Sequence, residues 1–210
     1  MYSTLKSFIT FTIFLFLAKC SSLDVAVSGN KQFLQGMKKI AIMNFEISGN
    51  EGPKEQEFSD IIAHQFLKET NLTVIERDKL VISKVIGEQS LSRSGIIDET
   101  TAAQMGKILG VDAIVIGKGE QLVIDKKSVD YCLNTFNIKV ISVETGNIFA
   151  NVIKQPGIEW SPLMTFKYII GFGLVWDKND MLLETCKITF LAERAVKGIQ
   201  SEMEKINRKQ

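Results

Sequence analysis

The sequence has few of the residues on which metal, redox and nucleic-acid chemistry depend. It contains one histidine, three cysteines and three prolines, and 25 basic side chains are balanced by 24 acidic ones for a net charge of +1. So little histidine and cysteine leaves few ligands for a transition metal, and a balanced charge gives no general attraction to nucleic acid. We therefore expect no metal, no cofactor and no nucleic-acid partner.

Catalytic motifs are also missing. The glycines between 110 and 119 do not have the spacing of a phosphate-binding loop, and Gly117-Lys-Gly119 does not lead into an expected helix. His64 has no second histidine to pair with, and the serines near 90 have no nucleophile-elbow context. We expect that the protein is not an enzyme.

The chain nevertheless has what a folded domain requires. Its 210 residues are 45% hydrophobic and 23% charged, which is typical of one globular domain that can bury a core. This composition excludes wholesale disorder and a protein with several membrane spans.

The first twenty residues resemble an export signal. Residues 1–19 hold no acid, and an apolar stretch of eleven residues ends at Ala18, shorter than the 18 to 20 residues needed to span a bilayer as a helix. Leu17-Ala18-Lys19-Cys20 resembles a bacterial lipobox, which predicts a signal peptide over 1–19 and a fatty-acylated Cys20. An uncleaved anchor and plain secretion are the alternatives. Residues 20–37 are interpreted as the lipidated cysteine and a tether, and 38–210 as the domain.

Hydrophobic periodicity predicts a single α/β domain. Short apolar runs predict strands over 38–45, 72–76 and 111–116. Apolar residues at helical spacing predict helices over 58–66, 78–86, 98–109 and 188–206, and a period of two predicts a hairpin of 136–141 with 148–152. We expect a mixed sheet with helices packed on it, one β-hairpin and a long C-terminal helix.

The central region resembles a known family. A strand ends in Val74-Ile75-Glu76-Arg77, Glu88-Gln89 follows, and a helix-to-strand element contains Asp98, Thr101, Ala102, Gly106, Leu109, Gly110, Val111, Asp112 and Gly117. Ser142 to Ile148 then resembles a hairpin turn. In order and spacing these motifs are similar to those of the CsgG-type family of bacterial envelope lipoproteins, which includes curli-type assembly and transport components and, more distantly, LpoB-like activators.

The resemblance implies a lipid-anchored protein on the periplasmic face of the bacterial outer membrane, which binds copies of itself or another envelope protein. It implies a function as an assembly or transport component. Two alternatives stay open: an adaptor that regulates an envelope enzyme without forming a pore, and a lipoprotein that binds a small molecule or glycan.

The motif residues are interpreted as determinants of the fold. Gly106 is expected to let a helix approach the sheet closely, and Gly110 to form the turn after that helix. Glu76, Arg77 and Asp112 are expected at strand ends, where a charge is solvated or paired. Gly117 is likewise interpreted as a determinant of the fold.

Two segments and two cysteines complete the candidate residues. Residues 119–134 are too short and too charged for a membrane hairpin. The aromatic stretch within 154–184 is interpreted as a buried strand or oligomer contact, with membrane-surface insertion and part of a barrel as alternatives. Its contact candidates are Trp160, Phe166, Phe172 and Trp176. Cys132 and Cys186 form either a disulfide or two buried thiols.

Overall fold

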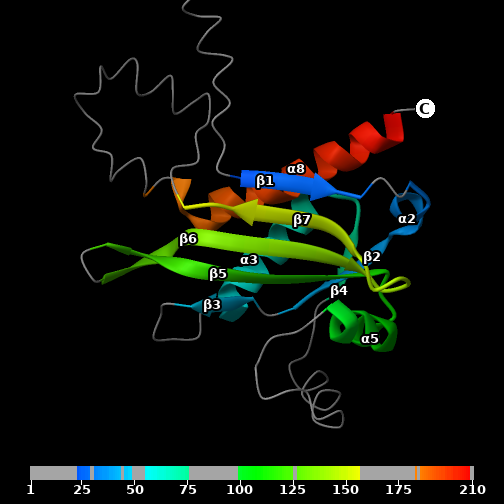
Figure 1. Ribbon diagram of the computed structural model, residues 1–210, viewed down its shortest axis with the longest axis horizontal. Helices are drawn as coiled ribbons and strands as arrows, with labels where there is room; N and C mark the ends of the chain where they lie inside the picture. The colour runs from blue at the N-terminus through cyan, green and yellow to red at the C-terminus, as the bar shows by residue number, and fades with distance from the viewer. Residues whose placement is uncertain are drawn as a thin grey trace, which may run out of the picture.

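A seven-stranded mixed sheet organises the described part of the computed structural model, which comprises residues 23–28, 31–43, 45–48, 55–75, 99–124, 127–156, 183 and 185–208. The strands follow the order β1-β7-β6-β5-β2-β4, and β3 pairs with β5 beyond β2 (Figure 1). Their bounds are β1 Leu23–Val27, β2 Lys39–Ile42, β3 Glu46–Ser48, β4 Thr73–Ile75, β5 Ala113–Ile124, β6 Lys127–Ser142 and β7 Ile148–Lys154.

Both strand directions occur in this sheet, so the predicted mixed α/β class is confirmed. β2 pairs in parallel with β4 and β5, whereas β5, β6, β7 and β1 form successive antiparallel pairs. The predicted hairpin is the β6–β7 pair, in which Ile138 lies opposite Val152. Its turn contains Gly146 with φ of 72°, a left-handed conformation that glycine adopts at little cost.

Helices cover the two faces of the sheet unequally. The helices of the described part are α2 Lys31–Gly36, α3 Glu55–Glu69, α5 Glu99–Leu109 and α8 Ile188–Arg208. The apolar stripes of α3 and α8 are buried against one face, which contains Ile40, Val115 and Ile138. The alternate residues Ala41 and Ile114 point to the other face and contact α5. The main core therefore lies between the sheet and the α3–α8 pair.

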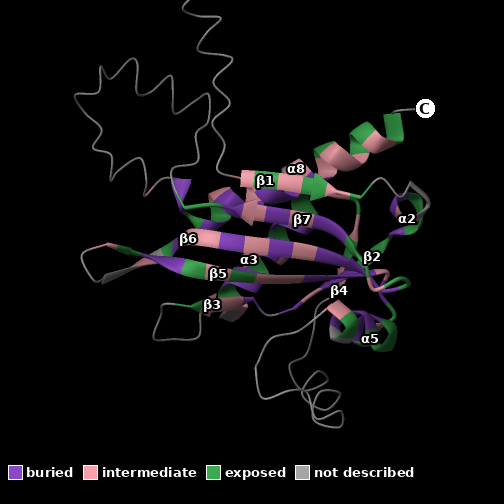
Figure 2. Ribbon diagram, in the orientation of Figure 1, coloured by how far each residue is buried: buried purple, intermediate pink, exposed green. Residues whose placement is uncertain are grey.

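The long C-terminal helix forms as the sequence predicts. Ile188, Leu191, Ala195 and Ile199 are buried, and the last two turns become progressively exposed (Figure 2). Gly198 lies under β1, where an added Cβ would be 2.8 Å from Val25 Cγ2. A glycine at this point lets the helix pass directly beneath the edge strand.

Two elements lie where the sequence analysis expected a tether. Residues 23–27 form β1, which pairs along its whole length with β7, and residues 31–36 form α2, which buries Leu34. The described fold therefore begins at Leu23 rather than at Lys38. The alternation of Leu23, Val25 and Val27 was the signal of this strand, but it spans only five residues.

Residues 119–134, which by sequence are too short and too charged for a membrane hairpin, belong mostly to β5 and β6. β5 continues to Ile124, and β6 begins at Lys127, so the two strands extend beyond the sheet as a ribbon (Figure 1). We call residues 119–124 and 127–134 the β5–β6 arm. Pairing is irregular within the arm, because the register shifts between Glu120 and Gln121 and again before Val123.

Candidate functional site

Asp112 joins three parts of the fold at the start of β5. Its Oδ2 atom accepts hydrogen bonds of 2.8 Å from the backbone N–H groups of both Lys38 and Lys39. Its own backbone N–H donates to the carbonyl of Lys39, and its carbonyl accepts from Val143. The carboxylate therefore fixes the entry into β2, and the backbone carbonyl of Asp112 fixes the turn after β6.

Two glycines of the family motif shape the helix that precedes Asp112. Gly110 has φ of 64° and ends α5, while the N–H of Val111 returns to the carbonyl of Gly106 at 3.1 Å. At Gly106 an added Cβ would be 2.1 Å from Val143 Cγ2 and 3.1 Å from Ile114 Cγ1. The close approach of α5 to the sheet therefore requires glycine at 106.

Gly117 has an equally specific partner on the opposite face. The ring of Phe45 lies over it, so an added Cβ would be 2.0 Å from Phe45 Cε1. Phe45 is 1% exposed, and its backbone N–H donates to the Ser59 hydroxyl on α3 at 2.9 Å. The sequence predicted Phe45 at the end of a buried strand over 38–45, whereas β2 ends at Ile42, and it gave no sign that the ring would cover Gly117.

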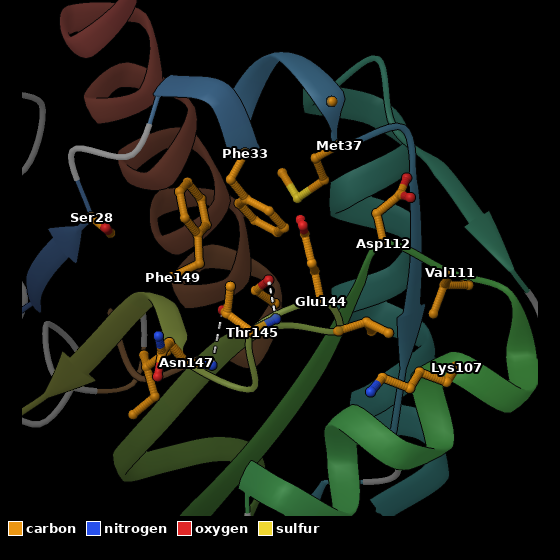
Figure 3. Close-up of a pocket in the computed structure, with 14 residues that line it drawn as sticks. Ser28, Phe33, Met37, Lys107, Val111, Asp112, Glu144, Thr145, Asn147 and Phe149 are labelled. Atoms are coloured by element: carbon orange, nitrogen blue, oxygen red, sulfur yellow. Dashed lines mark hydrogen bonds between the residues drawn. The ribbon is translucent and has the colours of Figure 1, made fainter.

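A cleft of about 480 Å³ opens beside Asp112, between α2, the end of α5 and the β6–β7 turn. Phe33 and Phe149 form its apolar wall, with ring centroids 4.9 Å apart. Lys107, Asp112 and Glu144 supply charged groups (Figure 3). The mixture of aromatic and charged side chains suits recognition of an amphipathic segment of another molecule.

The described lining of this cleft contains hydroxyl groups as well as charged ones. Its hydroxyls serve the turn: Ser142 Oγ accepts from the N–H of Thr145, and Thr145 Oγ1 accepts from the N–H of Asn147, both at 3.3 Å. Among the described residues, no cluster of three histidine, cysteine or acidic side chains is arranged to hold a metal ion.

The base of the β5–β6 arm carries the two candidate cysteines. Cys132 and Cys186 are joined in a disulfide with Cα atoms 4.7 Å apart, and both are nearly fully buried. The N–H of Leu133 also donates to the carbonyl of Cys186 at 2.9 Å. These bonds hold the arm against the start of α8, an arrangement that the sequence left open.

Polar contacts that the sequence did not indicate reinforce the arm. Tyr131 has φ of 58°, and its hydroxyl donates to Glu57 Oε1 on α3 at 2.8 Å. Lys154 is only 2% exposed, and its ammonium donates to the carbonyls of Asn134 at 2.6 Å and Gln155 at 3.1 Å. A lysine near the end of an apolar strand gives no sign in sequence that it will be buried.

Several predicted residues lie outside the described part of the chain. These are Cys20, the charged pair at one strand end and the aromatic contact candidates: Glu76, Arg77, Trp160, Phe166, Phe172 and Trp176. Of the remaining candidates, only Asp112 lines the cleft, and Gly106 and Gly110 are chain neighbours of the lining residues Lys107 and Val111. Gly117, Cys132 and Cys186 do not line it.

The part of the chain that contains the central motif matches a known protein family. Residues 24–122 match the family described as "Curli production assembly/transport component CsgG". The resemblance to the CsgG-type family is confirmed. The matched stretch begins in β1 and ends in the arm, and it includes Gly106, Gly110, Asp112 and Gly117. No curated protein sequence matches this chain.

Solved structures with similarity to this chain include three bacterial proteins. The PelC dodecamer from Paraburkholderia phytofirmans is 10% identical, with 86% of this chain and 95% of that one covered at a TM-score of 0.46. The C-terminal domain of LpoB from Salmonella enterica is 10% identical, with 60% and 94% covered at 0.40. The hypothetical protein CT253 from Chlamydia trachomatis is 14% identical, with 83% and 99% covered at 0.42. Similarity at this level does not indicate what the chain binds.

None of the helices in the described ranges is long and apolar enough to cross a bilayer.

Proposed function

We propose that this CsgG-type chain is an envelope lipoprotein on the periplasmic face of the bacterial outer membrane, where it acts as an assembly or transport component by binding other proteins. The observation that carries the proposal is the match of residues 24–122 to a family described as a curli assembly and transport component. The match begins four residues after the cysteine of a lipobox-like sequence, so the expected anchor and the family domain are contiguous.

The anchor is the first part to test. Each buried methylene of an acyl chain contributes about 0.8 kcal/mol, so two or more chains on Cys20 hold the protein firmly on a membrane. Labelled palmitate should enter the wild-type protein and be absent from Cys20→Ser. Replacing Cys132 and Cys186 with alanine in a second control should leave the labelling unchanged. Equal labelling of wild type and Cys20→Ser would contradict the anchor.

Binding, rather than catalysis, is supported by how the polar groups near the cleft are used. The Asp112 carboxylate and the Ser142 and Thr145 hydroxyls are engaged in hydrogen bonds to the backbone. Such groups position strands and turns. Hydrolytic turnover by the purified protein, retained through purification and lost in a cleft variant such as Lys107→Ala, would contradict this part of the proposal.

A second copy of the same chain is the partner that the family resemblance favours. Light scattering after size-exclusion chromatography of the lipidated protein in detergent should show one discrete multimer. The same measurement on Cys20→Ser separates association of the domain from association of acyl chains, and the multimer should persist. A monomer in both samples would favour an adaptor that binds a different envelope protein.

A further inference from the structure

The geometry points to the tip of the β5–β6 arm as a membrane contact: its exposed apolar side chains, Val123 foremost, rest in the headgroup region of the lipid surface to which Cys20 attaches the chain. This inference rests on the proposed anchor at Cys20. It assigns an orientation of the domain on the membrane, with the arm toward the lipid and the β6–β7 turn with its cleft away from it.

The connection between Cys20 and the sheet is short. β1 begins at Leu23, so only Ser21 and Ser22 separate the ordered sheet from Cys20. A fully extended chain covers at most about 3.6 Å per residue, which places the Leu23 Cα within about 11 Å of the Cys20 Cα. The tether of 17 residues expected from sequence would have left the orientation of the domain free.

The arm extends toward the side of the sheet from which the chain enters β1. Leu23 pairs with Lys154, Lys154 with Phe136, and Phe136 with Gly119, so these residues form one row across the sheet. β1 is antiparallel to β7, and β5 runs in the same direction as β7. The chain that enters β1 therefore leaves the row on the side toward which β5 continues, and Figure 1 shows the arm projecting on that side.

The arm extends beyond this row at least as far as the connection to Cys20 can reach. From Gly119 to Ile124 β5 advances five residues, or about 17 Å at the usual rise of a strand. Cys20 lies at most about 11 Å beyond the same row. With its acyl chains in the bilayer, the anchor therefore brings the arm tip to the lipid surface.

The arm carries exposed apolar and aromatic side chains. Val123 is 50% exposed, and Ile124 beside it is half-buried. Tyr131 is 41% exposed, with its hydroxyl on Glu57, and amphipathic tyrosine is common at membrane interfaces. Leu122 packs on the Cys132–Cys186 disulfide, which holds the arm in place. The arm thus presents apolar side chains from a braced position, as a surface contact and not as a span.

Site-directed spin labelling tests the contact on the lipidated protein in vesicles of phosphatidylethanolamine and phosphatidylglycerol. Val123→Cys carries the label on the arm, and Ile148→Cys is the matched control, because Ile148 is a 40% exposed apolar residue at the opposite end of the sheet. The acylated Cys20 and the disulfide do not react. Power saturation should show a severalfold lower accessibility to a nickel chelate, and a higher one to oxygen, at 123 than at 148. Equal accessibility at both positions would overturn the inference.

A longer connection between Cys20 and β1 tests whether the short connection is what holds the arm at the membrane. Fifteen Gly/Ser residues inserted between Ser22 and Leu23 add a typical reach of about 20 Å, so the label at 123 should then match the label at 148. Protection that persists with the insertion would overturn the role of the short connection. Flotation with vesicles separates the proposed anchor from the proposed orientation. Protein that does not float contradicts the anchor itself. Protein that floats while the label at position 123 is exposed to solvent contradicts only the orientation.

Discussion

Replacing Gly117 with alanine tests whether the family motif encodes packing rather than a ligand site. The added methyl group would enter the space of the Phe45 ring, with distances of 2.0 Å to Cε1 and 2.5 Å to both Cδ1 and Cζ. Carbon atoms in contact normally lie about 3.5 to 4.0 Å apart, so the ring must move by about 1.5 Å.

The ring has little room for that movement. Phe45 is 1% exposed, and the hydrogen bond from its N–H to Ser59 ties its backbone to α3. Overpacking a core costs about 1 to 3 kcal/mol, and a site this confined belongs near the upper end. Alanine in place of a strand glycine recovers about 0.5 to 1 kcal/mol of backbone entropy. We therefore expect Gly117→Ala to lower the free energy of unfolding by about 2 kcal/mol.

Urea unfolding of the mature chain, followed by far-ultraviolet circular dichroism with the disulfide intact, measures this loss. Gly36→Ala is the control, because an added Cβ there has no atom within 4 Å, and its effect should stay within about 0.5 kcal/mol. In a Phe45→Leu background the ring is gone, so Gly117→Ala should be close to neutral. The same loss in both backgrounds would refute the explanation.

Three further substitutions test a carboxylate, the disulfide and an ion pair. Asp112→Ala removes a carboxylate that accepts two backbone hydrogen bonds, so the free energy of unfolding in urea should fall by about 2 kcal/mol, with Asp112→Asn losing less. Replacing Cys132 and Cys186 with alanine should lower it by up to about 4 kcal/mol, because the bond spans a sequence separation of 54, and dithiothreitol should then have no further effect. The hydrogen bond from Lys197 lowers the pKa of Glu193 below its ordinary 4.5. The contribution of this pair to stability is therefore present above pH 4.5 and is lost as the pH falls through the lowered pKa of the folded state. Carboxylate NMR titration should therefore show the Glu193 midpoint rising in Lys197→Met.

Elements with a strong period could be predicted from sequence. The stripe of Phe58, Ile62 and Phe66 becomes the buried face of α3, and the stripe from Ile188 to Ile199 becomes the buried face of α8. These helices have enough turns for several apolar residues to repeat at helical spacing. Short strands do not: β1 has five residues and β3 has three, and their place in the sheet depends on partners distant in sequence.

The candidate site could be predicted only in part, for a similar reason. The positions of Gly110 and Asp112 follow from local signals, namely a helix end and a strand start. The contacts that make the glycines necessary do not, since Phe45 meets Gly117 from 72 residues away and Val143 meets Gly106 across a helix–sheet interface. Nothing in the local sequence of a glycine shows which side chain will occupy the space above it.

The motif glycines also limit what the family resemblance can explain. Gly117 receives Phe45 on the face of the sheet that α3 and α8 cover, and Gly106 brings α5 to the opposite face. A motif that fixes packing on both faces identifies a scaffold, and many ligands are compatible with one scaffold. What distinguishes this chain must therefore lie in surfaces that the motif leaves free. The cleft beside α2 and the exposed side of the arm are two such surfaces, and they occupy opposite ends of the sheet. If the arm faces lipid, the cleft faces away from the membrane, where a protein partner would have access to it.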